Sequence, residues 1–155
     1  MEKWKRTLIA TAPNREVAGN VAFSLEQLLD RDGALIRLGA NERALTHRLA
    51  VYLEPLFPSW NVDCEYNREG IGKKRNSAGK LVLPDVIIHR RMTDENLLVI
   101  EVKTGSSVRR ARDDKKKLRD YRQMQRYQHA LFIDLASVLA DSEYALEWID
   151  RDDTD

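Results

Sequence analysis

The sequence contains a single cysteine and no long run of apolar residues. Cys64 alone can form neither an internal disulfide nor a cysteine-rich zinc site, which is typical of a protein from a reducing compartment. The first thirteen residues hold no apolar stretch of signal-peptide length. Nothing in the sequence approaches the roughly 18 apolar residues that span a bilayer. We therefore expect a cytoplasmic protein without a membrane partner.

An overall excess of charge is also nearly absent, because 26 Lys and Arg residues balance 25 Asp and Glu residues. This balance conceals two uneven segments. Residues 109–126 hold nine basic residues and three acids, whereas residues 141–155 hold seven acids and one base. The basic segment indicates contact with a polyanion.

The length of 155 residues suits one domain over 1–155, and it is enough to bury a core without disulfides. We expect 1–40 to be an N-terminal helical extension, 41–136 the core, and 137–155 an edge strand with an acidic tail. Asn14 is an expected helix cap, Asp32-Gly33 is the expected end of that helix, and Asn41 is the expected start of the next one. The expected helices cover 14–29, 41–56 and 108–128, and the expected strands cover 60–67, 81–89, 97–104, 129–136 and 144–149. This order predicts an α/β fold, with a mixed central β-sheet flanked by helices.

Two acids are expected to meet on adjacent strands. In the strand 97–104, Leu97, Val99, Glu101 and Lys103 share one face, because side chains in a strand alternate. Both faces are otherwise apolar, so the strand is central, and charges on it are costly unless they are paired or bound. A hairpin turn centred on Thr93 places Asp85 directly opposite Glu101, with the Cβ atoms about 5 Å apart.

Adjacent carboxylates favour a divalent cation. Mg²⁺ prefers a few carboxylate oxygens and retained waters, and Mn²⁺ is a possible substitute. The backbone carbonyl of Val102 is a further candidate ligand, and Lys103 brings a positive charge to the rim of the site. Glu42 lies on the same stripe as Leu45 of its helix, so its side chain is expected to point inward and join the group.

These residues resemble the PD-(D/E)xK nuclease superfamily, which has the fold of restriction endonucleases. The resemblance lies in Pro84-Asp85, followed after fifteen residues by Glu101-Val102-Lys103, and in Glu42 as the first acidic motif. The charged helix over 113–127 is similar to the second core helix of the family. The stretch LPDVIIHRR…NLLVIEVK is similar to small stand-alone bacterial members.

The resemblance covers about 41–136, and it implies a restriction-endonuclease-like core. It implies metal-dependent hydrolysis of phosphodiester bonds, most directly in DNA. Asp85 and Glu101 would hold Mg²⁺, Lys103 would position or activate the attacking water, and Glu42 would support a ligand or a second metal.

The partner implied by this function is nucleic acid, with DNA expected ahead of RNA. Lys and Arg contacts to phosphates would give affinity without sequence information. A homodimer or a protein partner would have to supply specificity, because no separate recognition module is evident. The candidate nucleic-acid-binding residues are Lys73, Lys74, Arg75, Arg109, Arg110, Lys116, Lys117 and Tyr121.

Other interpretations stay open. The domain can be a catalytically silent nucleic-acid-binding subunit, or a protein-interaction adaptor that uses its charged helix and acidic tail. The charged helix can also be a solvated face with pairs such as Asp113–Lys117, spaced i,i+4. His89, on the face of Asp85 but four residues along, is expected at the strand end or the DNA rim rather than at a metal.

Overall fold

The computed structural model describes residues 1–66, 83–105 and 108–149. Residues 68–80, whose three glycines and five basic residues are typical of a basic loop, lie outside these ranges. Five strands form one sheet in the order β1-β2-β3-β4-β5. Only the β3–β4 pair is parallel, and the other neighbours are antiparallel, so the expected mixed sheet is confirmed. The strands are β1 (Asn61–Cys64), β2 (Val86–His89), β3 (Asn96–Lys103), β4 (His129–Asp134) and β5 (Leu146–Trp148).

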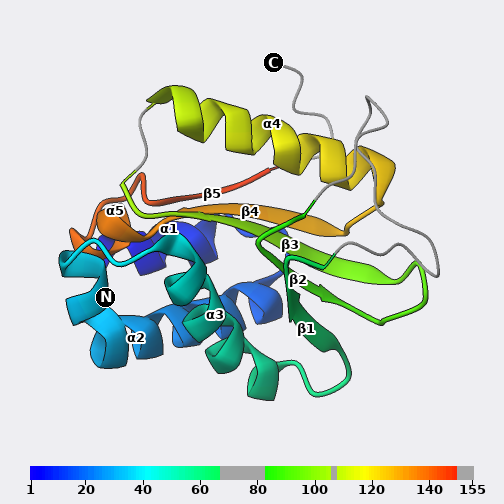
Figure 1. Cartoon of the computed structure of the whole chain (residues 1–155), viewed down its shortest axis with the longest axis horizontal. Coiled ribbons are helices and arrows are strands. Elements are labelled where there is room, and N and C mark those ends of the chain that lie inside the picture. The colour runs from blue at the N-terminus through cyan, green and yellow to red at the C-terminus, as the bar shows by residue number, and fades with distance from the viewer. Residues whose placement is uncertain (67–82, 106–107, 150–155) are drawn as a thin grey trace.

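Helices cover both faces of this sheet (Figure 1). Among the described residues, α4 (Val108–Met124) is the helix on one face, where it contacts β3 and β4. The opposite face carries α1 (Lys3–Ala10), α2 (Arg15–Arg37), α3 (Glu42–Leu53) and α5 (Leu135–Leu139), with a short 3₁₀ turn, η1 (Glu54–Leu56), after α3. No helix within the described ranges is long and apolar enough to cross a membrane.

The N-terminal helices belong to the main hydrophobic core. Trp4 and Leu8 of α1 and Val21 and Leu25 of α2 are almost fully buried, in the same cluster as Ile100 of β3. Burial of such side chains stabilises the fold by about 1.5–3 kcal/mol each. Residues 1–40 therefore supply part of the helical layer on this face of the sheet, together with α3 and α5.

Asn14 caps α2 as expected, because its side chain accepts a hydrogen bond from the backbone N–H of Val17. The expected end at Asp32-Gly33 is wrong, since the helix continues to Arg37. A glycine inside a helix costs about 1 kcal/mol relative to alanine. Burial of Ile36 in the following turn outweighs that cost.

The helix α3 places Glu42 at its first turn. Asn41 is the cap, and its side chain accepts a hydrogen bond from the N–H of Ala44 at 2.9 Å. Leu45 and Leu49 follow on the buried stripe and are fully buried against α2 and the sheet. The cap and the stripe together fix the height and rotation of α3, and hence the position of Glu42.

The β2–β3 hairpin has the register expected from a turn at Thr93. Val86 pairs with Ile100, and Ile87 pairs with Val99. The register shifts between Ile88 and His89. Leu97 consequently packs in the core on the α1–α3 side, which corrects its expected place on the face of Val99.

The chain after β3 also differs in detail from the expectation. The strand expected over 129–136 ends at Asp134, whose side chain accepts a hydrogen bond from the N–H of Ala136 and so caps α5. Two hydrophobic clusters result, one on each face of the sheet. The cluster under α4 contains Ile87, Val99, Leu118, Tyr121, Tyr127, Ala130, Phe132 and Ile149.

Candidate active site

Asp85 and Glu101 meet at the end of the β2–β3 hairpin, as the register predicts. Their carboxyl groups are hydrogen-bonded to each other, and Glu101 is only 4% exposed. Burial raises the pKa of Glu101 well above its usual range, and the hydrogen bond and negative charge of Asp85 add to this rise. Glu101 is therefore the protonated partner that donates, and Asp85 is the acceptor.

The backbone of Val102 is part of the same arrangement. Its N–H donates a hydrogen bond of 2.8 Å to Oδ2 of Asp85. In an antiparallel pair, the N–H and C=O of one residue point toward the same neighbouring strand. The carbonyl of Val102 therefore also points to the β2 side. The residue opposite it in the continued register is Pro84, which has no N–H to donate. Because Pro84 stands opposite Val102, the Val102 carbonyl has no backbone N–H on that side from which to accept a hydrogen bond.

Lys103 lies between two carboxylates from helices on opposite faces of the sheet. Its Nζ is 3.6 Å from Oε1 of Glu42 in α3 and 3.3 Å from Oδ2 of Asp114 in α4. Burial acts to lower the pKa of Lys103, but the charges of Asp114 and Glu42 outweigh it, and the pKa is raised. The ammonium group therefore stays charged.

Glu42 is also tied to the end of β3 through Thr104. Its Oε2 accepts hydrogen bonds from the backbone N–H of Thr104 at 3.2 Å and from its hydroxyl at 3.4 Å. The structure thus brings Glu42 to Lys103, as expected. The Glu42 side chain is 40% exposed.

Asp114 is a site residue that the sequence analysis missed. It is 3% exposed, and its Oδ1 lies 3.7 Å from Nζ of Lys117 in addition to the Lys103 contact. Burial raises its pKa against the opposing effect of the two lysines. The signal that identifies it is its place on a buried stripe with Leu118 and Tyr121, where an acid is unexpected. The expected Asp113–Lys117 pairing is replaced by this i,i+3 pair.

We expected Tyr121 among the nucleic-acid-binding residues, but the structure buries its side chain. It is 3% exposed and hydrogen-bonded to Glu101, so its side chain belongs to the interior of the site. Burial first, and then the neighbouring Glu101, raises the pKa of the phenol. The hydroxyl is therefore neutral and supports the Glu101 carboxyl from the α4 side.

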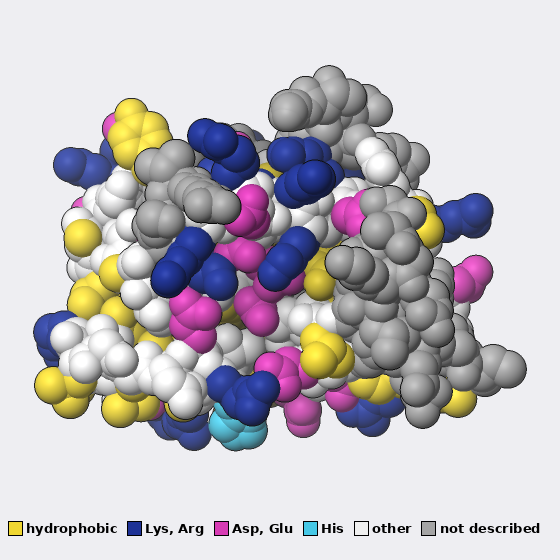
Figure 2. Space-filling view, turned by 45° about the horizontal axis from the view of Figure 1, so that its top comes forward, with side chains coloured by type: hydrophobic (Ala, Val, Ile, Leu, Met, Phe, Trp, Pro, Cys, Tyr) yellow, Lys and Arg dark blue, Asp and Glu magenta, His cyan; other side chains and the backbone are white. Residues whose placement is uncertain are grey.

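Basic side chains surround the acidic group. Figure 2, in which the α4 side is turned forward, shows Lys and Arg side chains around a central set of Asp and Glu side chains. Among the residues expected to bind nucleic acid, Arg110, Lys116 and Lys117 are exposed on α4. Arg109 lies in α4, but its side chain is outside the described part. Residues 73–75, which include Lys73, Lys74 and Arg75, are also outside it.

A pocket of about 630 Å³ opens beside the acidic residues. It lies between the start of α3 and the end of β1, and both Glu42 and Asp85 line it. Arg43 and Glu65 lie on the same lining and form an ion pair at 3.1 Å. The site is thus open from the α3 side, while α4 closes it from the other.

The candidate metal ligands are few, but they are oxygen atoms, which hard cations prefer. Within the described ranges, no group of three or more His, Cys, Asp or Glu side chains is arranged to hold a metal ion. Mg²⁺ needs few protein ligands, because it keeps several waters and uses substrate phosphate oxygens. Asp85, Glu101 and the Val102 carbonyl offer oxygen ligands only. The hydrogen bond between Glu101 and Asp85 marks the place where a cation would hold the two carboxyl groups together instead.

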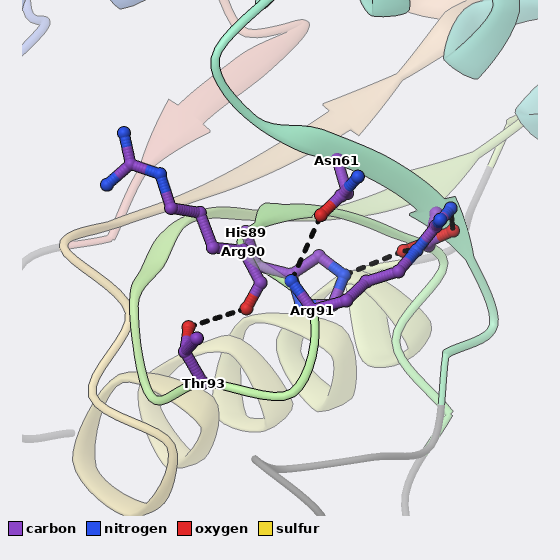
Figure 3. A network of polar contacts seen from close by, with 6 residues as sticks. Asn61, His89, Arg90, Arg91 and Thr93 are labelled. Carbon is purple, nitrogen blue, oxygen red and sulfur yellow. Dashed lines mark hydrogen bonds and ion pairs between the residues drawn. The ribbon is translucent and has the colours of Figure 1, made fainter.

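A second polar network lies at the start of β1 and the end of β2, away from Asp85. His89 is 2% exposed, and its Nε2 lies 2.7 Å from Oδ2 of Asp63, which also forms two hydrogen bonds with Arg91. Figure 3 shows this end, where the N–H of Arg91 donates to the side chain of Asn61 at 3.0 Å. Although burial opposes it, the bonding by His89 and Arg91 lowers the pKa of Asp63. His89 ends its strand as expected, but it is a buried partner of Asp63 rather than a residue of an exposed rim.

Comparison with protein-family models, with curated proteins and with solved structures finds no match to this chain.

Proposed function

We propose that this chain is a divalent-metal-dependent nuclease of the PD-(D/E)xK type that hydrolyses phosphodiester bonds, with DNA as the expected substrate. The observation that supports this proposal most directly is the buried, hydrogen-bonded pair of Asp85 and Glu101. A buried pair of acids is costly to the fold unless something binds it. Lys103 lies two residues beyond Glu101, and its ammonium group is held in place.

The order of elements supports this proposal. Three antiparallel strands are followed by α4 as a crossover and by β4, which is parallel to β3. The helix α4 thus follows the third strand of the sheet, which is the place that the resemblance implies for the second core helix of the family. The site residues come from the end of β3, the start of β2 and the first turn of α3, so they gather at one edge of the sheet.

The roles of the residues follow from their contacts. Asp85, Glu101 and the carbonyl of Val102 would hold Mg²⁺, which when bound would supply Lewis acidity at a phosphate oxygen and a more acidic water. Lys103 would stabilise the negative charge that develops on the phosphate in the transition state. Glu42 would orient Lys103 or support a ligand, and the hydroxyl of Tyr121 would orient Glu101.

Exposed basic residues on α4 would contact the phosphate backbone next to the site. These contacts would position the strand without reading its sequence. A second copy of the chain, related by a two-fold axis, would allow both strands of a duplex to be cut. A protein partner is the other source of specificity.

A silent nucleic-acid-binding or adaptor role is the second candidate. Two observations favour it. The described residues offer few candidate metal ligands, and Lys103 is already ion-paired with Glu42 and Asp114. Binding without cleavage, sensitive to salt, would support the nucleic-acid-binding form. Binding to a protein partner through an apolar interface would change little with salt.

The test is cleavage of supercoiled plasmid and of labelled single- and double-stranded oligonucleotides, in Mg²⁺, in Mn²⁺ and in EDTA. We expect metal-dependent cleavage that Asp85→Asn and Lys103→Met each reduce by about 10²-fold or more. Asp94→Asn, in the exposed β2–β3 turn, is the matched control and should cleave like the wild type. A wild-type protein that cuts none of these substrates in either metal would contradict the proposal.

A further inference from the structure

Asp114 is a buried acid at a position where an apolar side chain would stabilise the fold better. It lies on the buried stripe of α4, where Leu118 is an apolar neighbour on the same face. Its Oδ2 is buried and forms an ion pair with Nζ of Lys103 at 3.3 Å. A carboxylate in such a position loses hydration, which an apolar side chain of similar size would not.

The two carboxylates that hold Lys103 are not equivalent. The Asp114 side chain is 4% exposed, whereas that of Glu42 is 40% exposed and borders the open pocket. Asp114 is also held by the packing of α4 on β3 and β4. Asp114 is therefore the fixed contact of the Lys103 ammonium group, and Glu42 is the contact that substrate or solvent can reach.

We propose that Asp114 is a positioning residue that holds the Lys103 ammonium group at the edge of the site for phosphodiester hydrolysis. The proposal rests on the proposed nuclease function and adds to it a residue of α4 that touches neither metal nor substrate. Side chains that orient a catalytic group in this way typically contribute about 10–100-fold to activity.

Lys117 is the other cation near Asp114, and its geometry separates it from Lys103. Its Nζ lies 3.7 Å from Oδ1 of Asp114, and its side chain is 60% exposed. The Lys103 side chain is 24% exposed and has a second carboxylate neighbour. Lys103 is thus the more constrained of the two, and the one whose position depends on Asp114.

The experiment compares wild type with Asp114→Asn and Asp114→Ser, and uses Asp113→Asn as the matched control. Asp113 is exposed and precedes Asp114 in the same helix. The first readout is the ¹⁵N–¹H NMR signal of the Lys103 ammonium group, assigned by its loss in Lys103→Arg. The second is steady-state cleavage in Mg²⁺, with kcat and KM measured separately. Circular dichroism verifies that each variant is folded.

We expect both Asp114 variants to lose the Lys103 ammonium signal and to lower kcat by about 10–100-fold, with KM and the half-saturating Mg²⁺ concentration unchanged. Asp113→Asn should behave as wild type in both readouts. Retention of the signal, or of wild-type kcat, in a folded Asp114 variant would overturn the proposal. A wild-type protein that neither cleaves nor binds Mg²⁺ would instead refute the nuclease function, and the positioning role would fall with it.

Discussion

The carboxyl of Glu101 donates a hydrogen bond to the carboxylate of Asp85 across the β2–β3 hairpin. This contact exists because Glu101 keeps its proton in a buried site where a second negative charge would be unfavourable. The same pair therefore reduces the stability of the fold, and it holds the two carboxyl groups that the proposed metal site would use.

Glu101→Gln should stabilise the metal-free protein. The pKa of Glu101 is higher in the folded than in the unfolded state, so folding is penalised increasingly as pH rises above its ordinary value of about 4.5. Glutamine removes this penalty and can still donate to Asp85. Thermal melts should show an increase of a few degrees at pH 7.5 and almost none at pH 4. Glu143→Gln, an exposed substitution, should give no increase at either pH; a lower melting temperature for Glu101→Gln at pH 7.5 would contradict this account.

Asp63→Asn should destabilise the end of β1 and β2 by about 2 kcal/mol at pH 7, because it weakens charged hydrogen bonds to His89 and Arg91. The pKa of Asp63 is lowered in the folded state. Its contribution is therefore full above the unfolded pKa near 4 and declines as pH falls below that value. Urea unfolding at pH 7 and pH 3 should give a smaller difference between variant and wild type at pH 3. An equal difference at both values would be inconsistent with the ionised network.

His129→Phe should make the protein less sensitive to mild acid. Both ring nitrogens of His129 are buried without a hydrogen-bond partner, and the ring lies edge-on to Trp148. Burial first, and then the charge of Arg122, lowers the pKa of His129. The wild type should accordingly lose stability as pH falls below about 6.5, the unfolded value, until the folded pKa is passed. Urea unfolding between pH 7 and pH 5 should show a flatter profile for His129→Phe. His47→Gln, at an exposed histidine, should retain the wild-type slope.

Lys116→Gln should weaken binding of DNA oligonucleotides of different sequence to the same extent. It should also reduce the slope of log K against log salt by about one unit, because one phosphate contact is lost. Fluorescence anisotropy from about 50 to about 200 mM salt measures both effects. Lys3→Gln, at an exposed lysine of α1 on the opposite face, should change neither. Equal effects of the two substitutions would show that α4 is not the nucleic-acid surface.

The hairpin and its acids were predictable because their geometry is local. A short connector between two strands fixes the register, and alternation along β3 then fixes the face of Glu101. The α3 cap at Asn41 and the buried leucine stripe after it were equally local, and they placed Glu42.

The features that the sequence did not reveal depend on contacts distant in the chain. The end of α2 is decided by burial of Ile36 in the core, against the local signal of Gly33. The role of Asp114 depends on which face of α4 packs on the sheet, and a helix this rich in charge shows that face poorly. Leu97 changes sides because of a register shift that alternation cannot foresee.

The most direct test of the account is calorimetric titration of Mg²⁺ into metal-free protein, with wild type, Asp85→Ala and Glu65→Gln compared in one buffer. Glu65 lines the same pocket as Asp85 but is paired with Arg43, so it is the matched control. The account predicts that wild type and Glu65→Gln bind Mg²⁺ and that Asp85→Ala does not. Absence of binding by the wild type, even with DNA present, or undiminished binding by Asp85→Ala, would contradict it.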